Sequence, residues 1–428
     1  MQNMPPPLRF RAASWVLYDL ANTIFSAAIT FLFVPNIAAA STGLINSLTM
    51  IVAGIGTPIF ASLADRTGNA GRYNTIATLV CIVALSLLGV FESTPALLTT
   101  FFIATLFYQA ALVFYNSLLP SVARENRLGL VSGLGVGLGY LGTVLTLVVF
   151  LPLQRVMGLQ SEFFPVALAF LVFALPCMLL VRDRRPINRE KITLPLVRQQ
   201  WAELLETLRT LPKTPALMWF LIANFWAVDV LNTAILFYGR FLKDSFEPLA
   251  KRGELSLLGY HIFNIQDFII IGGLAVNLPA LIYGLGLGHF ADRFGARKMY
   301  LISIASFSVG LIGAGIFGGW APLWFLISIC FFAGLGLAGV WTVGRKILIE
   351  LVPRDLVARY FGLYGITNKV SVIGSTVCGV MLQYFGPRWA ILSQVFPLLL
   401  AFFCLYMMWK STHNSTSDEK NKASRSSP

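Results

Sequence analysis

The sequence carries little charge and few of the side chains that bind metals. Asp, Glu, Lys and Arg make up only 12% of its 428 residues, whereas a soluble domain carries about 25%. It has three His and five Cys, each Cys lies alone in an apolar stretch, and no Cys/His pair has the spacing of a metal site. No Ser/His/Asp or paired-carboxylate set suggests catalysis, and no Walker A motif is present. We therefore expect no metal, no cofactor, no disulfide and no enzyme activity.

Long apolar runs dominate the rest of the chain. Hydrophobic residues account for 57% of it, and about 20 apolar residues in a row allow a helix to cross a bilayer. These runs predict an all-α integral membrane protein with twelve transmembrane helices. The expected spans are 12–38, 43–64, 73–93, 96–119, 130–153, 163–181, 215–240, 267–290, 299–318, 321–343, 360–384 and 388–410.

The net charge of +13 is distributed by side of the membrane and is not gathered in one patch. When the loops are assigned alternately to the two sides, most of the 32 Lys and Arg fall on the side of both chain ends. Cytoplasmic loops carry such an excess, so we expect a multi-pass protein of the plasma (inner) membrane with both termini cytoplasmic. This distribution accounts for the basic charge, and we do not expect nucleic-acid binding.

Composition divides the chain into four parts. Residues 1–181 and 215–410 are each expected to form a six-helix bundle, and 411–428, rich in Ser, Asn and Lys, a disordered cytoplasmic tail. The hydrophilic stretch 182–214 is expected to be a cytoplasmic linker. Its apolar residues recur at helical spacing from Leu194 onward, which predicts an amphipathic helix, either on the membrane surface or packed beneath the bundle.

A costly polar pattern occurs once in each half. Asp19 and Asn22 lie three residues apart inside the first apolar run, and Asp229 and Asn232 repeat this spacing inside the seventh. A carboxylate in a membrane helix costs about 2.5–3.5 kcal/mol on insertion scales, so it is rarely kept without a use. The repeated pattern predicts two pseudo-symmetric halves with working groups between them.

Three further matches recur in the same order. The stretch 64–68 pairs with 291–295, and Ser132-Gly133-Leu134 pairs with Phe361-Gly362-Leu363. Pro120, after the fourth span, pairs with Pro353, after the tenth. Two sets of six spans joined by a basic linker form the parallel-repeat arrangement of major facilitator transporters.

Several strings narrow this resemblance. Residues 288–298, GHFADRFGARK, resemble the signature loop that follows the eighth span in the major facilitator superfamily. Residues 15–22, 114–120, 132–142 and 361–364 resemble the "unknown major facilitator" family, which includes the autophagy-related vacuolar amino-acid effluxers. The resemblance covers nearly the whole chain. It implies transport by alternating access, with the first and seventh spans lining a central cavity.

The candidate residues of that cavity carry both signs of charge. Asp19 and Asp229, which the resemblance implies face the cavity, could carry a proton or pair with an amine of the substrate; the alternative is a helix cap or an interhelical hydrogen bond. Lys369 could bind a carboxylate or neutralise Asp229, or extend its side chain to the cytoplasmic face. The neutral candidates for hydrogen bonds to the substrate, each also explained by packing alone, are Asn22, Tyr115, Asn232 and Asn368.

Two further sets of residues are expected to take part in the conformational change, one as a gate and one as a helix-packing face. The resemblance implies a cytoplasmic gate in which an Asp caps a neighbouring helix and binds an Arg; the alternative is a solvated turn. The gate residues are Asp65, Arg66, Asp292, Arg293 and Arg297. Gly135 and Gly139 fit a close helix-packing face better than a dinucleotide site, because no strand precedes them.

Together these features predict a secondary active transporter of a small solute. The favoured substrate is an amino acid or similar zwitterion, with proton coupling as a hypothesis. Two alternatives stay open: an exporter of amphiphilic cations or drugs, and a non-transporting membrane receptor or scaffold. The expected partners are the substrate, protons and the lipid bilayer, and the protein is expected to be a monomer.

Overall fold

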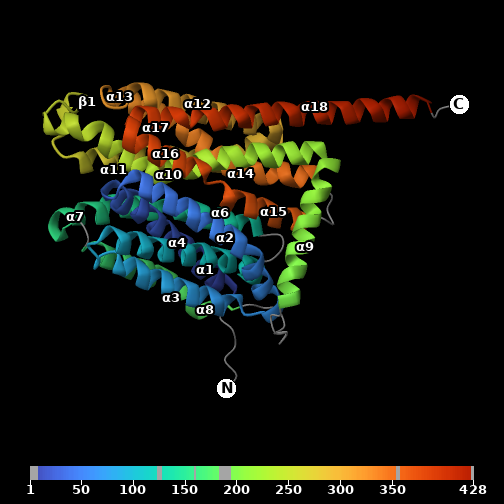
Figure 1. Ribbon diagram of the computed structural model, residues 1–428, viewed down its shortest axis with the longest axis horizontal. Helices are drawn as coiled ribbons and strands as arrows, with labels where there is room; N and C mark the ends of the chain where they lie inside the picture. The colour runs from blue at the N-terminus through green and yellow to red at the C-terminus, as the bar shows by residue number, and fades with distance from the viewer. Residues whose placement is uncertain (1–7, 123–127, 159–160, 183–193, 353–356, 426–428) are drawn as a thin grey trace, which may run out of the picture.

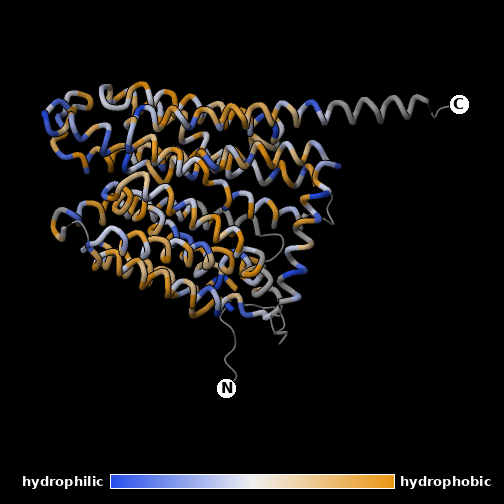
Figure 2. The backbone as a smooth tube through the Cα atoms, in the orientation of Figure 1, coloured by the Kyte–Doolittle hydropathy of each residue, from blue (hydrophilic) through white to orange (hydrophobic). Residues whose placement is uncertain are grey.

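The computed structural model describes residues 8–122, 128–158, 161–182, 194–352 and 357–425. Twelve helical segments in this part of the chain are long and apolar enough to cross a membrane, as the sequence predicts. Hydrophobic residues run along these segments, while hydrophilic ones gather at the turns that join them (Figure 2). The fold is therefore an all-α bundle of spanning helices.

The first half of the chain forms six spans. Its elements are α1 (Leu8–Ala28), the π-helix η1 (Ile29–Phe33), the 3₁₀ helix η2 (Val34–Asn36), α2 (Ala39–Thr67), α3 (Ala70–Leu87), α4 (Thr94–Ser117), α5 (Leu119–Val122), α6 (Leu128–Leu145), the π-helix η4 (Thr146–Phe150), α7 (Leu151–Met157) and α8 (Phe163–Leu180). The linker that follows contains α9 (Leu194–Thr210) and the 3₁₀ helix η5 (Leu211–Lys213).

The second half supplies the other six spans. Its elements are α10 (Pro215–Lys251), the strands β1 (Ser256–Leu257) and β2 (Tyr260–His261), α11 (Ile265–Phe294), α12 (Ala296–Phe317), α13 (Pro322–Ile327), the π-helix η6 (Ser328–Ala333), α14 (Gly334–Leu351), α15 (Val357–Val370), α16 (Ile373–Phe385), α17 (Pro387–Ser393) and α18 (Val395–Arg425).

The two halves lie side by side with a common axis direction (Figure 1). Helix α9 crosses one end of the bundle, and we call this the linker end. The opposite end carries α7 and the β1–β2 hairpin, and we call it the loop end. Helix α9 contacts α2 at the linker end and buries Thr207, while Leu205 and Leu208 stay exposed. The helix thus contacts the bundle and keeps exposed apolar side chains, and its placement on the membrane surface or beneath the bundle stays a prediction.

Three segments differ from the ranges expected from the sequence. Helix α10 continues past residue 240 to Lys251, so the expected 241–266 loop shrinks to a short β-hairpin. The eleventh span is two helices, α15 and α16, and not one. Helix α18 runs to Arg425 through the expected disordered tail, where no Gly or Pro occurs before Pro428 to end it.

A buried carboxylic acid lies between two spans at the loop end. Glu162 is fully buried, and its Oε1 accepts a hydrogen bond from Gln154 Nε2 at 2.8 Å. Burial raises the pKa of the Glu162 carboxyl to about 7, against the opposing effect of hydrogen bonds from its own backbone and from Gln154. The folded state thus holds this proton more tightly than the unfolded state, in which the carboxyl has its ordinary pKa of 4.5.

This shift predicts a pH-dependent stability with a defined sign. Below about pH 4.5 Glu162 is protonated in both the folded and the unfolded state, so it does not lower the stability. Above about pH 7 it is ionised in both states, and the folded state bears the full cost of a buried charge. The melting temperature of the purified protein should fall between these values. Glu162→Gln should remove that part of the fall, whereas Glu92→Gln, at an exposed site, should not. Equal pH profiles for the wild type and Glu162→Gln would contradict the assignment.

Candidate functional site

A central cavity of about 350 Å³ lies between the two halves. The first half contributes α1, η1 and α6 to its wall, and the second half contributes residues of α10, α11, α12, α14 and α16. Because both halves form the wall, a movement of one half against the other changes access to the cavity.

One face of the first span lines the cavity with polar groups. Asp19, Thr23, Ser26 and Thr30 follow one another at intervals of three or four residues, which places them on a single helix face. Asp19 is half-buried, and Thr23 Oγ1 donates to the Asp19 carbonyl at 3.0 Å. Of these four residues only Asp19 is predicted from the sequence to face the cavity, although the spacing of the three hydroxyl residues indicates the same helix face.

The opposite wall is mostly apolar. The second half contributes the aromatic and aliphatic side chains of Phe307, Leu311, Phe325, Ile329 and Trp341. Its neutral polar lining residues are Thr233, Tyr238, Asn277 and Gln394. Among the described lining residues Asp19 is the only charged one, so the cavity is amphiphilic and carries a single acidic group.

Helix α6 packs closely against the polar face of α1. A Cβ atom on Gly135 would lie 2.7 Å from Asp19 Oδ2, and one on Gly139 would lie 2.9 Å from Thr23 Oγ1. Gly142, one turn further, meets the Leu20 carbonyl in the same way at 2.5 Å. Larger residues at these positions would push α6 away from Asp19, so the glycine face sets how closely the carboxylate approaches α6.

Asp229 and Asn232 lie behind the cavity wall and not in it. Asp229 is fully buried, and both its carboxylate oxygens accept hydrogen bonds from the Gly374 N–H, at 2.9 and 3.0 Å. Asn232 Nδ2 donates to the Asn368 and Ser371 carbonyls at 3.3 and 3.2 Å. Both side chains of α10 therefore bind the region where the eleventh span is interrupted.

Asn368 and Lys369 also lie outside the described lining of the cavity. Asn368 Oδ1 accepts a hydrogen bond from Asn224 Nδ2 at 2.6 Å. The Lys369 ammonium donates to the Gln109 carbonyl at 3.2 Å, and this bond connects α15 of the second half with α4 of the first. Lys369 therefore joins the two halves through this bond.

Asn22 and Tyr115 are packed inside the first half. Tyr115 stacks on Trp15 and Tyr18, with ring centroids 4.3 and 4.8 Å apart, and its hydroxyl donates to the Trp15 carbonyl at 3.1 Å. Asn22 is 3% exposed, and its amide has no hydrogen-bond partner among the described residues. The structure does not bring either side chain to the cavity lining.

The expected cytoplasmic gate residues lie at the linker end. Arg293 is exposed, with its guanidinium 5.5 Å from the Phe294 ring centroid, and Arg297 is half-buried. The side chains of Asp65, Arg66 and Asp292 fall outside the described part of the structure. The gate role of this set remains a prediction.

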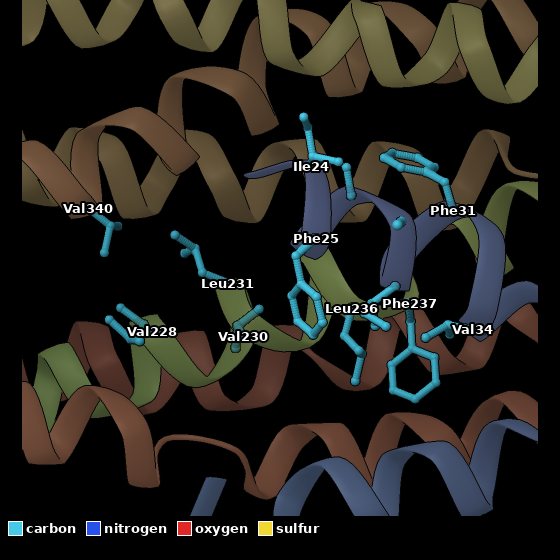
Figure 3. Close-up of a cluster of buried hydrophobic side chains, with 14 of the residues drawn as sticks. Ile24, Phe25, Phe31, Val34, Val228, Val230, Leu231, Leu236, Phe237 and Val340 are labelled. Atoms are coloured by element: carbon cyan, nitrogen blue, oxygen red, sulfur yellow. The ribbon is translucent and has the colours of Figure 1, made fainter. Parts of the chain in front are cut away.

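The loop end is closed by direct backbone contact between the halves. Gly239 of α10 faces the Thr30 carbonyl of η1 so closely that a Cβ atom would collide with it. Val34 lies beside Phe237 where the first span meets α10 (Figure 3). On the other side of the bundle, a Cβ on Gly379 of α16 would come within 2.5 Å of the Ala39 carbonyl of α2.

Polar contacts reinforce this closure. Arg240 Nη1 donates to the Pro35 and Ile37 carbonyls at 3.1 and 2.9 Å, and Lys243 Nζ donates to Asn36 Oδ1 at 2.8 Å. These bonds satisfy carbonyl groups left free where the first span ends. The cavity is thus separated from the loop end by contacts that involve both halves.

Comparison with known proteins agrees with this architecture. The family model described as Major Facilitator Superfamily matches residues 12–259 and 257–427. The chain belongs to the Major Facilitator Superfamily. A crystal structure of a point mutant of the nucleoside transporter NupG has a TM-score of 0.72 at 16% identity, and the match covers 94% of this chain and 99% of that chain. This superfamily member therefore shares its fold with a solved transporter over 94% of its length.

Curated relatives extend the comparison. An uncharacterized MFS-type transporter of Bacillus subtilis, YxiO, is 25% identical over 95% of this chain and 97% of its own length. Autophagy-related protein 22 of Yarrowia lipolytica is 24% identical over 61% of this chain and 46% of its own length. The vacuolar membrane amino acid uptake transporter fnx2 of Schizosaccharomyces pombe is 29% identical over 30% of this chain and 22% of its own length. The predicted resemblance to autophagy-related members of the superfamily is confirmed.

The backbone contact at Gly239 predicts how the loop end opens. Gly239→Val places methyl groups against η1, so it should separate the first span from α10 and favour a state open at the loop end. Spin labels at Leu44→Cys and Val377→Cys, both exposed positions on α2 and α16, should report longer distances, with the native cysteines replaced. Gly284→Val, where a Cβ meets nothing within 4 Å, is the matched control. An unchanged distance distribution in Gly239→Val would contradict this account.

Proposed function

We propose that this secondary transporter carries a small organic amine with an apolar body, by alternating access of the central cavity to the two sides of the membrane. The observation that carries the proposal is the cavity itself: it lies between two halves that touch at the loop end, and its described lining has one charged group. Relative movement of the halves would expose Asp19 first on one side and then on the other.

The chemistry of the lining supports an amine. A carboxylate that faces an ammonium group in a site shielded from water makes a charge-assisted hydrogen bond, which contributes about 1.5–3 kcal/mol. The hydroxyl groups of Thr23, Ser26 and Thr30 can accept the remaining N–H groups. The apolar wall that includes Phe307 and Trp341 can bury a hydrophobic body and stack on a cation.

An amino acid is the second candidate substrate. The similarity to fnx2, a vacuolar membrane amino acid uptake transporter, supports it, and so does one contact in the structure. A zwitterion needs a cation for its carboxylate, and the Lys369 ammonium is held by a hydrogen bond to the Gln109 carbonyl of the other half. Movement of the halves would break this bond and free the ammonium, so Lys369 is the group that an amino acid would require.

We further propose that the linker end faces the cytoplasm in the plasma (inner) membrane. The concentration of Lys and Arg in the loops on that side supports this orientation. The loop end, which is closed in this structure, would then face outward. On this orientation the structure corresponds to a state closed to the outside.

Binding to the purified protein tests the substrate class. A ligand at 100 times its Kd stabilises a protein by about 2.7 kcal/mol. Hydrophobic amines without a carboxylate should raise the melting temperature, and Asp19→Asn should weaken their binding by at least about 10-fold because it removes the charge. Glu254→Gln, at an exposed site near the β-hairpin, serves as the control. Stabilisation by amino acids only, lost in Lys369→Ala, would favour the second candidate.

Proton coupling through Asp19 is the proposed source of energy. It predicts that an imposed pH gradient drives substrate flux in proteoliposomes, and that Asp19→Asn loses the response to the gradient while it still exchanges substrate. The measurement compares flux with and without the gradient at equal substrate concentration. Wild-type flux that ignores the gradient would end the proton proposal without affecting the substrate assignment.

A further inference from the structure

The eleventh span is interrupted in the middle of the membrane region. Helix α15 ends at Val370 and α16 begins at Ile373. Val372, with φ −148° and ψ 10°, has left the helical conformation, and its N–H turns back to the Val370 carbonyl at 2.9 Å. An interrupted helix leaves backbone N–H and C=O groups without partners in the helix, and each costs several kcal/mol in a bilayer unless it is satisfied elsewhere.

Two side chains of α10 satisfy the two helix ends. The Asp229 carboxylate accepts from the Gly374 N–H at the start of α16, and the Asn232 amide donates to the Ser371 carbonyl after the end of α15. Their spacing of three residues places them about one turn apart on the same face of α10. The Asp-x-x-Asn pattern of this half therefore provides an acceptor, Asp229, for the start of α16 and a donor, Asn232, for the end of α15.

A third side chain comes from the opposite half. Ser47 Oγ of α2 donates to the Val372 carbonyl at 2.7 Å, and it accepts from Thr376 Oγ1 at 2.8 Å. Asn46, its neighbour in the chain, donates to Ser375 Oγ at 3.2 Å. The Val372 carbonyl, which also accepts from the Ser375 N–H of its own helix at 3.1 Å, is thus a second-site acceptor that the first half binds where the loop end is closed.

The first half has the same Asp-x-x-Asn pattern, at Asp19 and Asn22, but the helix that packs on it is not interrupted. Helix α6, which packs on Asp19, runs unbroken from Leu128 to Leu145. The N–H groups beside Gly135 belong to a continuous helix, so they are not available to cap a helix start as Gly374 does for Asp229. This difference separates the two carboxylates: one lines the cavity, and the other binds a helix end.

We propose that the interruption at Ser371–Val372 is the docking point through which the loop end closes, and that Asp229 and Asn232 are positioning residues that hold its shape. Ser47 binds the Val372 carbonyl in the closed state and leaves it when α2 separates from α16. Asp229 then acts through its acceptor oxygens and carries neither substrate nor a transported proton. The proposal rests on alternating access as the function of the protein.

The contact between Ser47 and Val372 is tested by a distance measurement that does not need a substrate. In the variant labelled at Leu44→Cys and Val377→Cys, Ser47→Ala should raise the ratio of open to closed loop ends by about 2- to 10-fold, the factor that one neutral hydrogen bond supplies. Thr49→Ala on the same helix is the matched control, because buried Thr49 bonds only the Ile45 carbonyl of its own helix. An unchanged ratio in Ser47→Ala would overturn the docking point.

The role of Asp229 is tested by a conservative variant. Asp229→Asn keeps an oxygen that can accept from Gly374, so it should keep the loop-end distances and gradient-driven transport within about 3-fold of the wild type. Asp229→Ala should shift the distances and lose transport. Loss of the response to a pH gradient in Asp229→Asn, with unchanged distances, would overturn the proposal, because Asp229 would then carry the proton.

These two readouts separate the inference from the proposed function. If the wild type transports none of the tested substrates, the proposed substrate class fails, while the distances in Ser47→Ala and Asp229→Ala still decide whether the docking point exists. If Asp229→Ala does not fold, Asp229→Asn and Ser47→Ala still carry the test.

Discussion

The need to satisfy every backbone polar group inside the bilayer governs this structure. A continuous helix meets that need by itself, whereas an interrupted helix depends on its neighbours. The chain meets the need at the eleventh span with Asp229 and Asn232 of α10, and Ser47 of the first half adds a bond to the Val372 carbonyl. The same requirement is seen where the first span ends, since Arg240 binds the Pro35 and Ile37 carbonyls. At the end of the first span, closure of the loop end thus also satisfies backbone carbonyl groups.

The two halves use one inherited pattern for different purposes. In the first half the Asp19 carboxylate packs on the unbroken α6 and reaches the cavity, while Asn22 points into the bundle. In the second half both polar residues of the pattern bind the interrupted span. An internal repeat therefore preserves the position of costly polar groups on a helix but not their partners, because the partners belong to other helices that have changed independently.

The sequence allowed the architecture to be predicted but only part of the site. Twelve spans and two halves followed from apolar run lengths and repeated motifs, which are local properties. The interruption at Ser371–Val372 has no Gly or Pro within it, so no local signal marks it, and the sequence alone could not place Asp229 behind the wall. The Thr23–Ser26–Thr30 stripe was readable from its spacing. Whether it faced the cavity or lipid depended on how α6 packs, and that is a tertiary property.

Because of the glycine contacts at the loop end, the way the transporter closes depends on other residues than the choice of substrate in its cavity. Gly239 and Gly379 bring backbone against backbone, so the fit there depends on small size and not on the chemistry of a particular side chain. Most of the cavity wall is built from other side chains, such as Thr23 and Trp341, and at Thr30 the contact with Gly239 uses the backbone carbonyl and not the side chain. Mutations that change what the cavity accepts can therefore accumulate without altering how it closes. A transporter built in this way can diversify its cargo during evolution while its mechanical cycle is inherited unchanged.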